Sequence, residues 1–488
     1  MEMLTAKVFI KGGILAPVDL RKIAHLAAGL GATHFQFGRR QELIIQIPDA
    51  AVEQFKLNFK AYETEIDYGQ GFTKHNIVSS YLANNILPST YWVKDGVFLD
   101  ILDDIDETPS IRVNITDLKQ DIVYSFTGDI NFVASEEVNL WHVYLRTVSE
   151  DNLTFLPYLI YSEDIKKVIT TFENLYRNDA SLEEIEQTLA ILLKTKLVES
   201  PLSPRIRVAE FFNYEGIHKY HEKYWLGIYK RNAEFNLSQL DSLCRLCEQN
   251  SIGQIHITPW KSLIIKDIIE ETLMDWKALL VKHNINNGHS QSELNWQIND
   301  FDERAFALKT YIRKEFAQGD FCTNGVIIGI NNRYKHSFSH IIIQEKLSRF
   351  FLGIPMKVTY DILHRKEFNP TLNEFLPFVQ DIKIHDLTPS LKELVEEYHQ
   401  KVYIDHTTFD AKPRISRKAL KKALIKEREY AYQCPHCLTT YDPIFGDETQ
   451  EIPAKTNFEE LQSTYLCSLC DAPKEEFIKV NKGELGVR

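Results

Sequence analysis

The spacing of the hydrophobic residues changes partway along the first 50 positions. Apolar residues recur at helical spacing from Leu20 to Ala28, and an alternating, strand-like order follows from Phe35 to Ile47. A further strand-like segment, VFIKGG near Val8, precedes the helical part. This pattern predicts a strand, a helix and two more strands in that order.

The same pattern returns about 220 residues later, which indicates a duplicated structural unit. The segment WLGIYKR near Trp225 is strand-like, and Leu240, Leu243 and Leu246 share one face of a predicted helix. Alternation follows from Ile255 to Ile265. We therefore predict two copies of one strand-helix-strand-strand unit.

The remaining segments before residue 400 mix strand-like and helical patterns. Strands are predicted at IRVNI, at DIVYSF (residues 121–126) and at the apolar run from Val326, and helices alternate with strands over residues 286–400. A helical pattern covers residues 162–197, where Ser181 and Glu184 have the spacing of a capping box. The predicted fold class is α+β.

Composition and charge narrow the choice of partner. The 68 acidic residues exceed the 56 basic ones and give a net charge of -12, so binding to nucleic acid is not expected. No apolar run approaches the length of about 18 residues that a membrane helix needs, and the first residues do not resemble a secretory signal. We expect a cytoplasmic protein that is not inserted into a membrane.

A basic segment, residues 411–428, is predicted to be a helix that links the main part of the chain to its end. Ala419, Leu420, Ala423 and Leu424 form an apolar stripe among its lysines and arginines. Two interpretations stay open. The helix is a solvated linker docked by this stripe, or its positive face meets an acidic partner or cofactor.

The cysteines carry the clearest chemical signal. Cys434, Cys437, Cys467 and Cys470 form two C-x-x-C pairs with 29 residues between them, whereas Cys244, Cys247 and Cys322 are scattered. In a reducing compartment such pairs act as metal ligands more often than as disulfides. Four thiolates suit tetrahedral zinc or a single iron, and the spacing alone does not choose between these metals.

The residues around the two pairs resemble a rubredoxin over its full length. The matching features are Tyr441-Asp442-Pro443, Gly446-Asp447, Phe458 and Leu461, Ala472-Pro473-Lys474, and Phe477. The resemblance implies one iron in a four-cysteine site that exchanges single electrons, with Tyr432, Tyr441, Phe458 and Phe477 limiting solvent access. Glycine usually follows each cysteine pair in that family, in a left-handed conformation. Here Leu438 and Asp471 take these places.

The rest of the chain resembles the sirohaem-dependent nitrite and sulfite reductases, and the repeats resemble their ferredoxin-like half domains. The segments Phe37–Gln41 and Ile257–Lys261 resemble the family's T-x-R-Q motif, and Thr127–Ala134 resembles an N-D-I-G-F-V segment. The resemblance implies the order half domain, α/β domain, half domain, α/β domain. The predicted divisions are 1–75, 76–215, 216–285, 286–410, 411–428 and 429–488.

Catalysis in that family needs sirohaem, a four-iron cluster and a cage of basic residues. Each cluster needs four cysteines, and residues 286–410 contain only Cys322, so no cluster is expected. We expect Cys244, Cys247 and Cys322 to serve in apolar packing. Candidates for binding an anion or cofactor are Arg39, Arg40, His75 and Arg112. No catalytic residue is assigned.

Three functional hypotheses follow from these two resemblances. In the first, the chain is an electron carrier that serves a redox partner, such as a nitrite or sulfite reductase or a flavoprotein donor. In the second, the chain is itself a sirohaem-type reductase fed by its own rubredoxin. In the third, it is a non-catalytic pseudo-subunit of a reductase complex with a structural metal.

Overall fold

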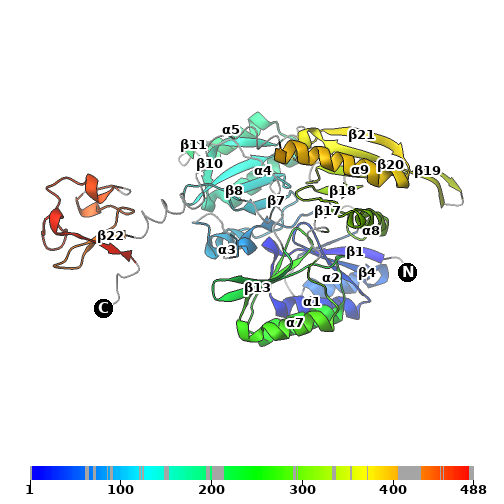
Figure 1. Cartoon of the computed structure of the whole chain (residues 1–488), viewed down its shortest axis with the longest axis horizontal. Coiled ribbons are helices and arrows are strands. Elements are labelled where there is room, and N and C mark those ends of the chain that lie inside the picture. Colours follow the sequence, from blue (N-terminus) through cyan, green and yellow to red (C-terminus); the bar gives the residue numbers. More distant parts are fainter. Residues whose placement is uncertain are drawn as a thin grey trace. The chain divides into compact units, whose positions relative to one another are not determined.

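The computed structural model divides the chain into two compact units, Met1–Val402 and Tyr403–Arg488, which we call the body and the terminal module (Figure 1). The predicted basic linker helix, residues 411–428, lies outside the described residues. The finer division of the body into four domains stays a prediction. The structure describes residues 3–482 except for 61–64, 70–72, 85, 88–91, 120–122, 124–125, 148–152, 194–197, 200–213, 289–292, 294, 332–336, 352–353, 371, 405–429, 451 and 454–455.

The two predicted repeats fold alike. The first contains β1 (Met3–Val8), β2 (Ile14–Leu15), α1 (Pro17–Gly29), β3 (Phe35–Phe37), β4 (Leu43–Pro48), α2 (Val52–Lys60) and β5 (Ile66–Tyr68). The second contains β12 (Gly216–Tyr220), β13 (Lys223–Ile228), β14 (Glu234–Phe235), α6 (Leu237–Gln249), β15 (Ile255–Ile257), β16 (Leu263–Ile268) and α7 (Leu273–Lys282). The prediction of a duplicated unit is confirmed.

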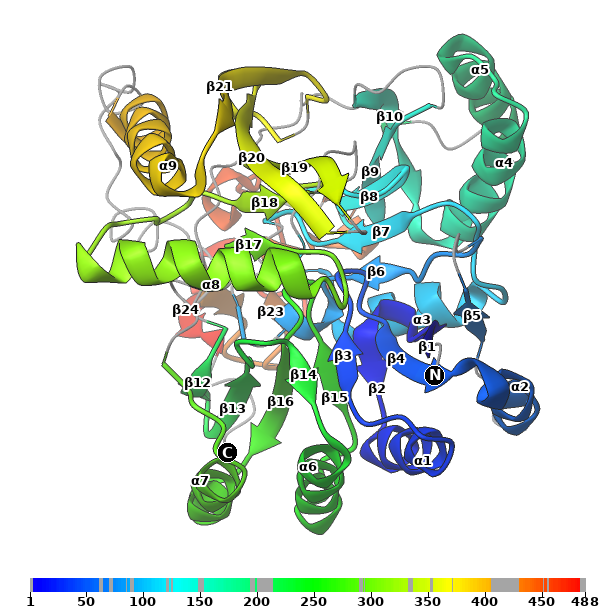
Figure 2. The same ribbon diagram turned by 90° about the vertical axis from the view of Figure 1, so that its right-hand side faces the viewer.

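Each repeat also lends a short strand to the sheet of the other. The first sheet has the order β14-β3-β4-β1-β5, and the second has the order β12-β13-β16-β15-β2. Phe235 of β14 pairs with Phe35 of β3, and Leu15 of β2 pairs with Ile255 of β15. Helices α1, α6 and α7 lie on one side of these strands (Figure 2). The buried apolar residues of both repeats therefore form one continuous core.

Two α/β sheets complete the body. The first has the order β11-β10-β9-β8-β7-β6 and the second has the order β17-β18-β19-β20-β21, and each combines three parallel strands with antiparallel ones. The first comprises β6 (Val78–Ser79), β7 (Val113–Thr116), β8 (Ile130–Ala134), β9 (Leu140–Leu145), β10 (Thr154–Tyr161) and β11 (Val198–Glu199), with α3 (Asp95–Asp104), α4 (Ile165–Arg177) and α5 (Leu182–Leu192). The second comprises β17 (Trp296–Gln297), β18 (Ile328–Ile330), β19 (Ile341–Phe351), β20 (Ile354–Arg365) and β21 (Phe375–Ile382), with α8 (Glu303–Gln318) and α9 (Ile384–His399). The α+β class is confirmed.

Two local predictions need correction. Val123 and Phe126, the described residues of the predicted strand DIVYSF, lie in a bend and a turn, and Phe126 has a φ of 72° that no strand permits. The helical pattern at 162–197 holds two helices, α4 and α5, because the chain turns at Asp179 with a φ of 52°. The predicted cap is present, since Ser181 Oγ accepts a hydrogen bond of 3.3 Å from the Glu184 N–H.

The terminal module is a small three-stranded sheet with the order β23-β22-β24 and a cluster of aromatic side chains. Its strands are β22 (Tyr430–Gln433), β23 (Thr440–Tyr441) and β24 (Ile478–Asn481). Short 3-10 turns connect the rest, at Glu448–Gln450, Phe458–Glu460 and Lys474–Glu476. Across the described parts of both units, the structure contains no helix long and apolar enough to span a bilayer.

Candidate metal centre

Two tight turns of matching geometry hold the four cysteines of the terminal module. In the first turn the Cys434 N–H donates to Thr439 O at 2.9 Å, and the Leu438 N–H donates to Cys434 O at 3.0 Å. In the second turn the Cys467 N–H donates to Ala472 O at 2.7 Å, and the Asp471 N–H donates to Cys467 O at 3.0 Å. The two C-x-x-C segments are therefore structural copies of one another.

Each turn closes through a residue in the left-handed region. Leu438 has a φ of 63° and Asp471 has a φ of 57°. The resembled family usually has glycine at these positions, and glycine adopts this conformation at much lower cost than leucine. Both turns thus keep the geometry that aims backbone N–H groups at sulfur, despite the missing glycines.

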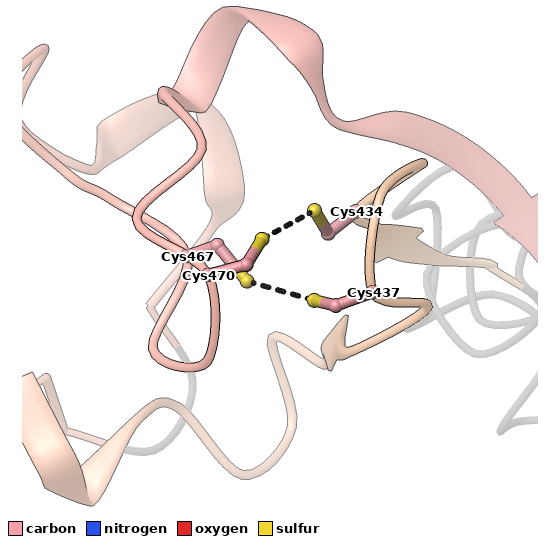
Figure 3. A group of neighbouring side chains, drawn as sticks. All are labelled: Cys434, Cys437, Cys467 and Cys470. Atoms are coloured by element: carbon pink, nitrogen blue, oxygen red, sulfur yellow. Dashed lines mark hydrogen bonds between the residues drawn. The ribbon is translucent and has the colours of Figure 1, made fainter.

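The four sulfur atoms converge on one point (Figure 3). All four Sγ atoms lie within 4.8 Å of one another, with Cys434 and Cys470 separated by 3.5 Å and Cys437 and Cys467 by 3.3 Å. A tetrahedral ion with metal–sulfur bonds of about 2.3 Å requires sulfur–sulfur distances of about 3.8 Å. The arrangement fits one iron or zinc ion, and the predicted ligand set comes together in space.

The two turns differ in exposure and in hydrogen bonding. Cys434 and Cys467 are buried, whereas Cys437 is partly exposed and Cys470 is exposed. The hydroxyl and the backbone N–H of Thr439 lower the pKa of the Cys437 thiol to about 6. A thiolate at this position is therefore favoured, as metal binding requires.

Aromatic side chains pack beside the sulfur atoms. Tyr441, Phe458, Leu461 and Tyr465 are buried together, and the ring of Tyr432 stacks on Phe458 with centroids 4.0 Å apart. The Tyr465 hydroxyl donates to Asp447 Oδ2 at 3.0 Å. The expected aromatic layer is present. It also includes Tyr465, which the sequence analysis did not name among the residues that limit solvent access.

The candidate basic residues of the body do not form one site. Arg40 donates to Asn76 O, Val113 O and Asn114 Oδ1 at 2.7–3.1 Å, so protein oxygens engage its guanidinium group. Burial and the neighbouring Arg112 lower the pKa of Arg40 to about 10. Arg112 itself lies 3.6 Å from Asp129 Oδ2.

His75 lies within the electrostatic reach of Arg40 and Arg112. Burial, followed by the positive charges of Arg112 and Arg40, lowers the pKa of His75 to about 3. The imidazole is therefore neutral near pH 7 and adds no positive charge to the group. Arg40, His75 and Arg112 lie close together. However, Arg40 already donates hydrogen bonds to protein oxygens, and Arg112 lies near the carboxylate of Asp129.

Arg39 points elsewhere, to the wall of a cavity of about 310 Å³. Its guanidinium donates to Gln297 Oε1 at 3.2 Å and to Asn299 Oδ1 at 3.3 Å. Arg231, Lys261 and Lys309 also line this cavity, together with Trp260 and Trp296. The sequence analysis identified Arg39 as a candidate but did not identify the other residues of the cavity wall, because these come from segments far apart in the chain.

Carboxylates balance much of this positive charge. Lys261 Nζ lies 2.5 Å from Asp300 Oδ1, and the fully buried Glu293 lies 2.7 Å from Arg231 Nε and 2.9 Å from Lys309 Nζ. Such buried pairs fix side chains in place rather than leaving them available. The cavity is therefore a preformed, mixed aromatic and polar space.

The cysteines of the body do not assemble a cluster site. Cys244 and Cys247 are buried on α6 in the core shared by the two repeats, and burial raises the pKa of Cys244 to about 12. The packing role predicted for this pair is confirmed. The same prediction is wrong for Cys322, which is exposed in the segment between α8 and β18. A four-iron cluster needs four thiolates, so these residues do not fit one.

Comparison with known proteins supports both parts of this description. Residues 431–477 match the rubredoxin family, and residues 218–283 match the nitrite/sulfite reductase ferredoxin-like half domain. Rubredoxin-2 of Chlorobaculum tepidum is 43% identical over 49 residues, which is 94% of that protein and 10% of this chain. The probable rubredoxin-1 of Methanocaldococcus jannaschii is 49% identical over 45 residues, and the match spans 56% of that protein.

The body has a structural relative of similar size. The structure of the Mycobacterium tuberculosis NirA protein superposes with a TM-score of 0.64 and 13% identity, over 86% of this chain and 84% of that chain. At this level of identity the likeness shows the fold alone. The chain belongs to the rubredoxin family through its terminal module, which is fused to a nitrite/sulfite reductase-like body that contains a ferredoxin-like half domain.

Proposed function

We propose that this chain is a single-electron carrier whose terminal module exchanges electrons with a redox partner. The observation that supports this proposal is the convergence of four cysteine sulfurs in a rubredoxin module, in the same chain as a body that lacks cluster ligands. Cys434, Cys437, Cys467 and Cys470 would hold one iron ion, and its ferric and ferrous states would supply one-electron exchange between a donor and an acceptor. A flavoprotein is a suitable donor, and a nitrite or sulfite reductase is a suitable acceptor.

The module's own residues suit this role. Four identical ligands held by two matching turns give both oxidation states the same geometry, so little reorganisation accompanies transfer. Cys437 and Cys470 lie toward the surface, while the aromatic cluster covers the inner side. Reduced thiols of this kind suit a reducing compartment such as the cytoplasm.

Metal analysis and a reduction titration of the full chain, isolated from iron-replete native cells, test this proposal. We expect one iron per chain, a ferric-thiolate absorption band, and loss of that band on uptake of one electron. A colourless protein that contains zinc would contradict the carrier role. It would favour the third hypothesis, a pseudo-subunit with a structural metal.

A second candidate function concerns the body. We propose that the cavity beside Arg39 binds a small anion. Arg231, Lys261 and Lys309 lie against carboxylates, whereas Arg39 donates to the neutral amide oxygens of Gln297 and Asn299 and lines the cavity together with two tryptophans. Its volume of about 310 Å³ is at the lower end of the range typical of ligand pockets. This proposal requires no sirohaem, and Arg40 has no role in it because Arg40 does not line the cavity.

Calorimetric titration of the full chain with nitrite and sulfite tests the second candidate. We expect saturable binding that Arg39→Gln weakens at least tenfold, while Arg177→Gln on the exposed side of α4 leaves it unchanged. Equal binding by both variants, or no binding by the unaltered chain, would remove this candidate without affecting the first.

A further inference from the structure

The two cysteine turns match in backbone geometry. They differ in the residue two positions after the second cysteine of each pair. That residue is Thr439 in the first turn and Ala472 in the second. In both turns its backbone N–H bonds to the sulfur of the second cysteine, which is Cys437 or Cys470. The hydroxyl of Thr439 is therefore an addition that the second turn lacks.

This hydroxyl lies in hydrogen-bonding position on a ligand atom. Thr439 Oγ1 is 3.2 Å from Cys437 Sγ, within the range for a hydrogen bond that involves sulfur. Once Cys437 binds a metal it is a thiolate with no proton to give, so the hydroxyl must be the donor. Cys437 Sγ thus accepts two hydrogen bonds from one residue, its N–H and its O–H.

The Thr439 hydroxyl belongs to a residue that is only partly accessible to solvent. The carbonyl of Thr439 is held by the Cys434 N–H, so backbone contacts on both sides fix the residue. Ala472 at the matching position is buried, and Cys470 next to it is exposed. The first turn therefore has a fixed side-chain hydroxyl beside its exposed-side cysteine, and the second turn has none.

We propose that the Thr439 hydroxyl raises the reduction potential of the metal centre by donating a hydrogen bond to Cys437 Sγ. The inference rests on the proposed electron-carrier function and names a residue that sets its driving force. With four thiolates, the ferric site carries a net charge of about -1 and the ferrous site about -2. A donor dipole aimed at sulfur stabilises the more negative state, so it favours uptake of the electron.

The test compares three variants of the full iron-loaded chain by equilibrium titration against redox dyes. Thr439→Val removes the hydroxyl and keeps the side-chain shape. It should lower the equilibrium constant for one-electron reduction about three- to tenfold, and tenfold corresponds to about 59 mV. Thr439→Ser keeps the donor and should stay close to the unaltered chain. Thr440→Val makes the same change on the exposed neighbouring residue and should have no effect.

A fourth variant keeps the inference testable if valine disturbs the turn. Thr439→Ala gives the first turn the same residue as the second and should also lower the potential. Equal potentials for the unaltered chain, Thr439→Val and Thr439→Ala would overturn the inference. This result is distinct from failure of the proposed function, which native zinc occupancy would show before any variant is made.

Discussion

At the scale of single residues, the left-handed positions after the two cysteine pairs decide how the metal turns close. Leu438 adopts a φ of 63°, where a leucine side chain costs about 1–2 kcal/mol relative to its usual conformations. Its side chain is 60% exposed, so little packing offsets that cost. Leu438 is therefore a locally strained residue beside the candidate metal ligand Cys437.

Replacing this leucine by glycine should stabilise the terminal module. We expect Leu438→Gly to raise its free energy of unfolding by about 1 kcal/mol, because glycine adopts a positive φ freely. Thermal loss of the ferric-thiolate absorption band measures the effect. Leu469→Gly is the matched control, since Leu469 is 72% exposed but is not at positive φ. A gain for Leu469→Gly equal to that for Leu438→Gly would contradict this account.

His75 provides a prediction about pH. Its pKa is lowered to about 3 in the folded chain by burial and by Arg112 and Arg40, whereas an unfolded histidine titrates near 6.5. Between these values the unfolded chain binds one more proton, so stability is full above pH 6.5 and falls as the pH decreases. We expect a loss of about 2 kcal/mol from His75 between pH 7 and pH 5.

The variant His75→Asn isolates this contribution. Urea unfolding of the body at pH 7 and at pH 5 should show a smaller decrease in stability for the variant than for the unaltered chain. His385→Asn is a suitable control because His385 lies exposed near the start of α9. An unchanged difference between the two pH values in His75→Asn would show that this imidazole does not titrate as described.

At the scale of elements, a single glycine allows β13 to lie against the segment that precedes the second repeat. A Cβ atom added to Gly227 would lie 1.7 Å from Tyr214 O, which is backbone and has no room to move aside. Tyr214 is fully buried and stacks on Trp260, a residue of the cavity wall. The strand, the preceding segment and the cavity therefore depend on the absence of a side chain at this position.

Gly227→Ala should destabilise the body by about 3 kcal/mol or more, as severe overpacking does. The midpoint of urea unfolding, followed by tryptophan fluorescence, measures the change. Gly253→Ala is the matched control, because a Cβ atom there meets nothing within 4 Å and the change should stay within about 0.5 kcal/mol. Similar midpoints for the two variants would refute the steric explanation.

The elements also show what the sequence pattern predicts well and what it misses. Periodicity predicted α1, α6 and the strands after them, and the Ser181 cap predicted the start of α5, because these signals act between near neighbours in the chain. The exchange of β2 and β14 between sheets was not predictable. Each of these strands has two residues, which is too short for a periodic signal, and their pairing joins residues about 200 to 240 positions apart.

The same division applies to the candidate sites. The four metal ligands were predictable because each pair lies within four residues and the turn geometry follows from the chain itself. The Thr439 hydroxyl required side-chain positions, and the cavity beside Arg39 required the fold, since its walls come from residues 36 to 309. The spacing of residues along the chain does not predict sites whose residues come from distant segments.

At the scale of the whole molecule, the two compact units have separate cores and differ in what stabilises them. The body contains large buried clusters. The buried core of the terminal module is much smaller and includes Tyr441, Phe458, Leu461 and Tyr465, with Ala431 and Ala472 and two of the cysteines. A module of this size rarely reaches useful stability from apolar burial alone. A metal ion held by the four cysteines would therefore supply much of its folding free energy.

Removal of two ligands should consequently unfold one unit and leave the other unchanged. In the variant Cys434→Ser/Cys467→Ser we expect calorimetry to lose the transition of the terminal module, because the remaining pair of thiolates cannot hold the ion. The transition of the body should move by less than about 1 °C, since the two units have separate cores. Cys322→Ser, which alters an exposed cysteine of the body, should preserve both transitions. If the body transition shifts together with that of the module in the double variant, the two units fold cooperatively and the metal stabilises the whole chain.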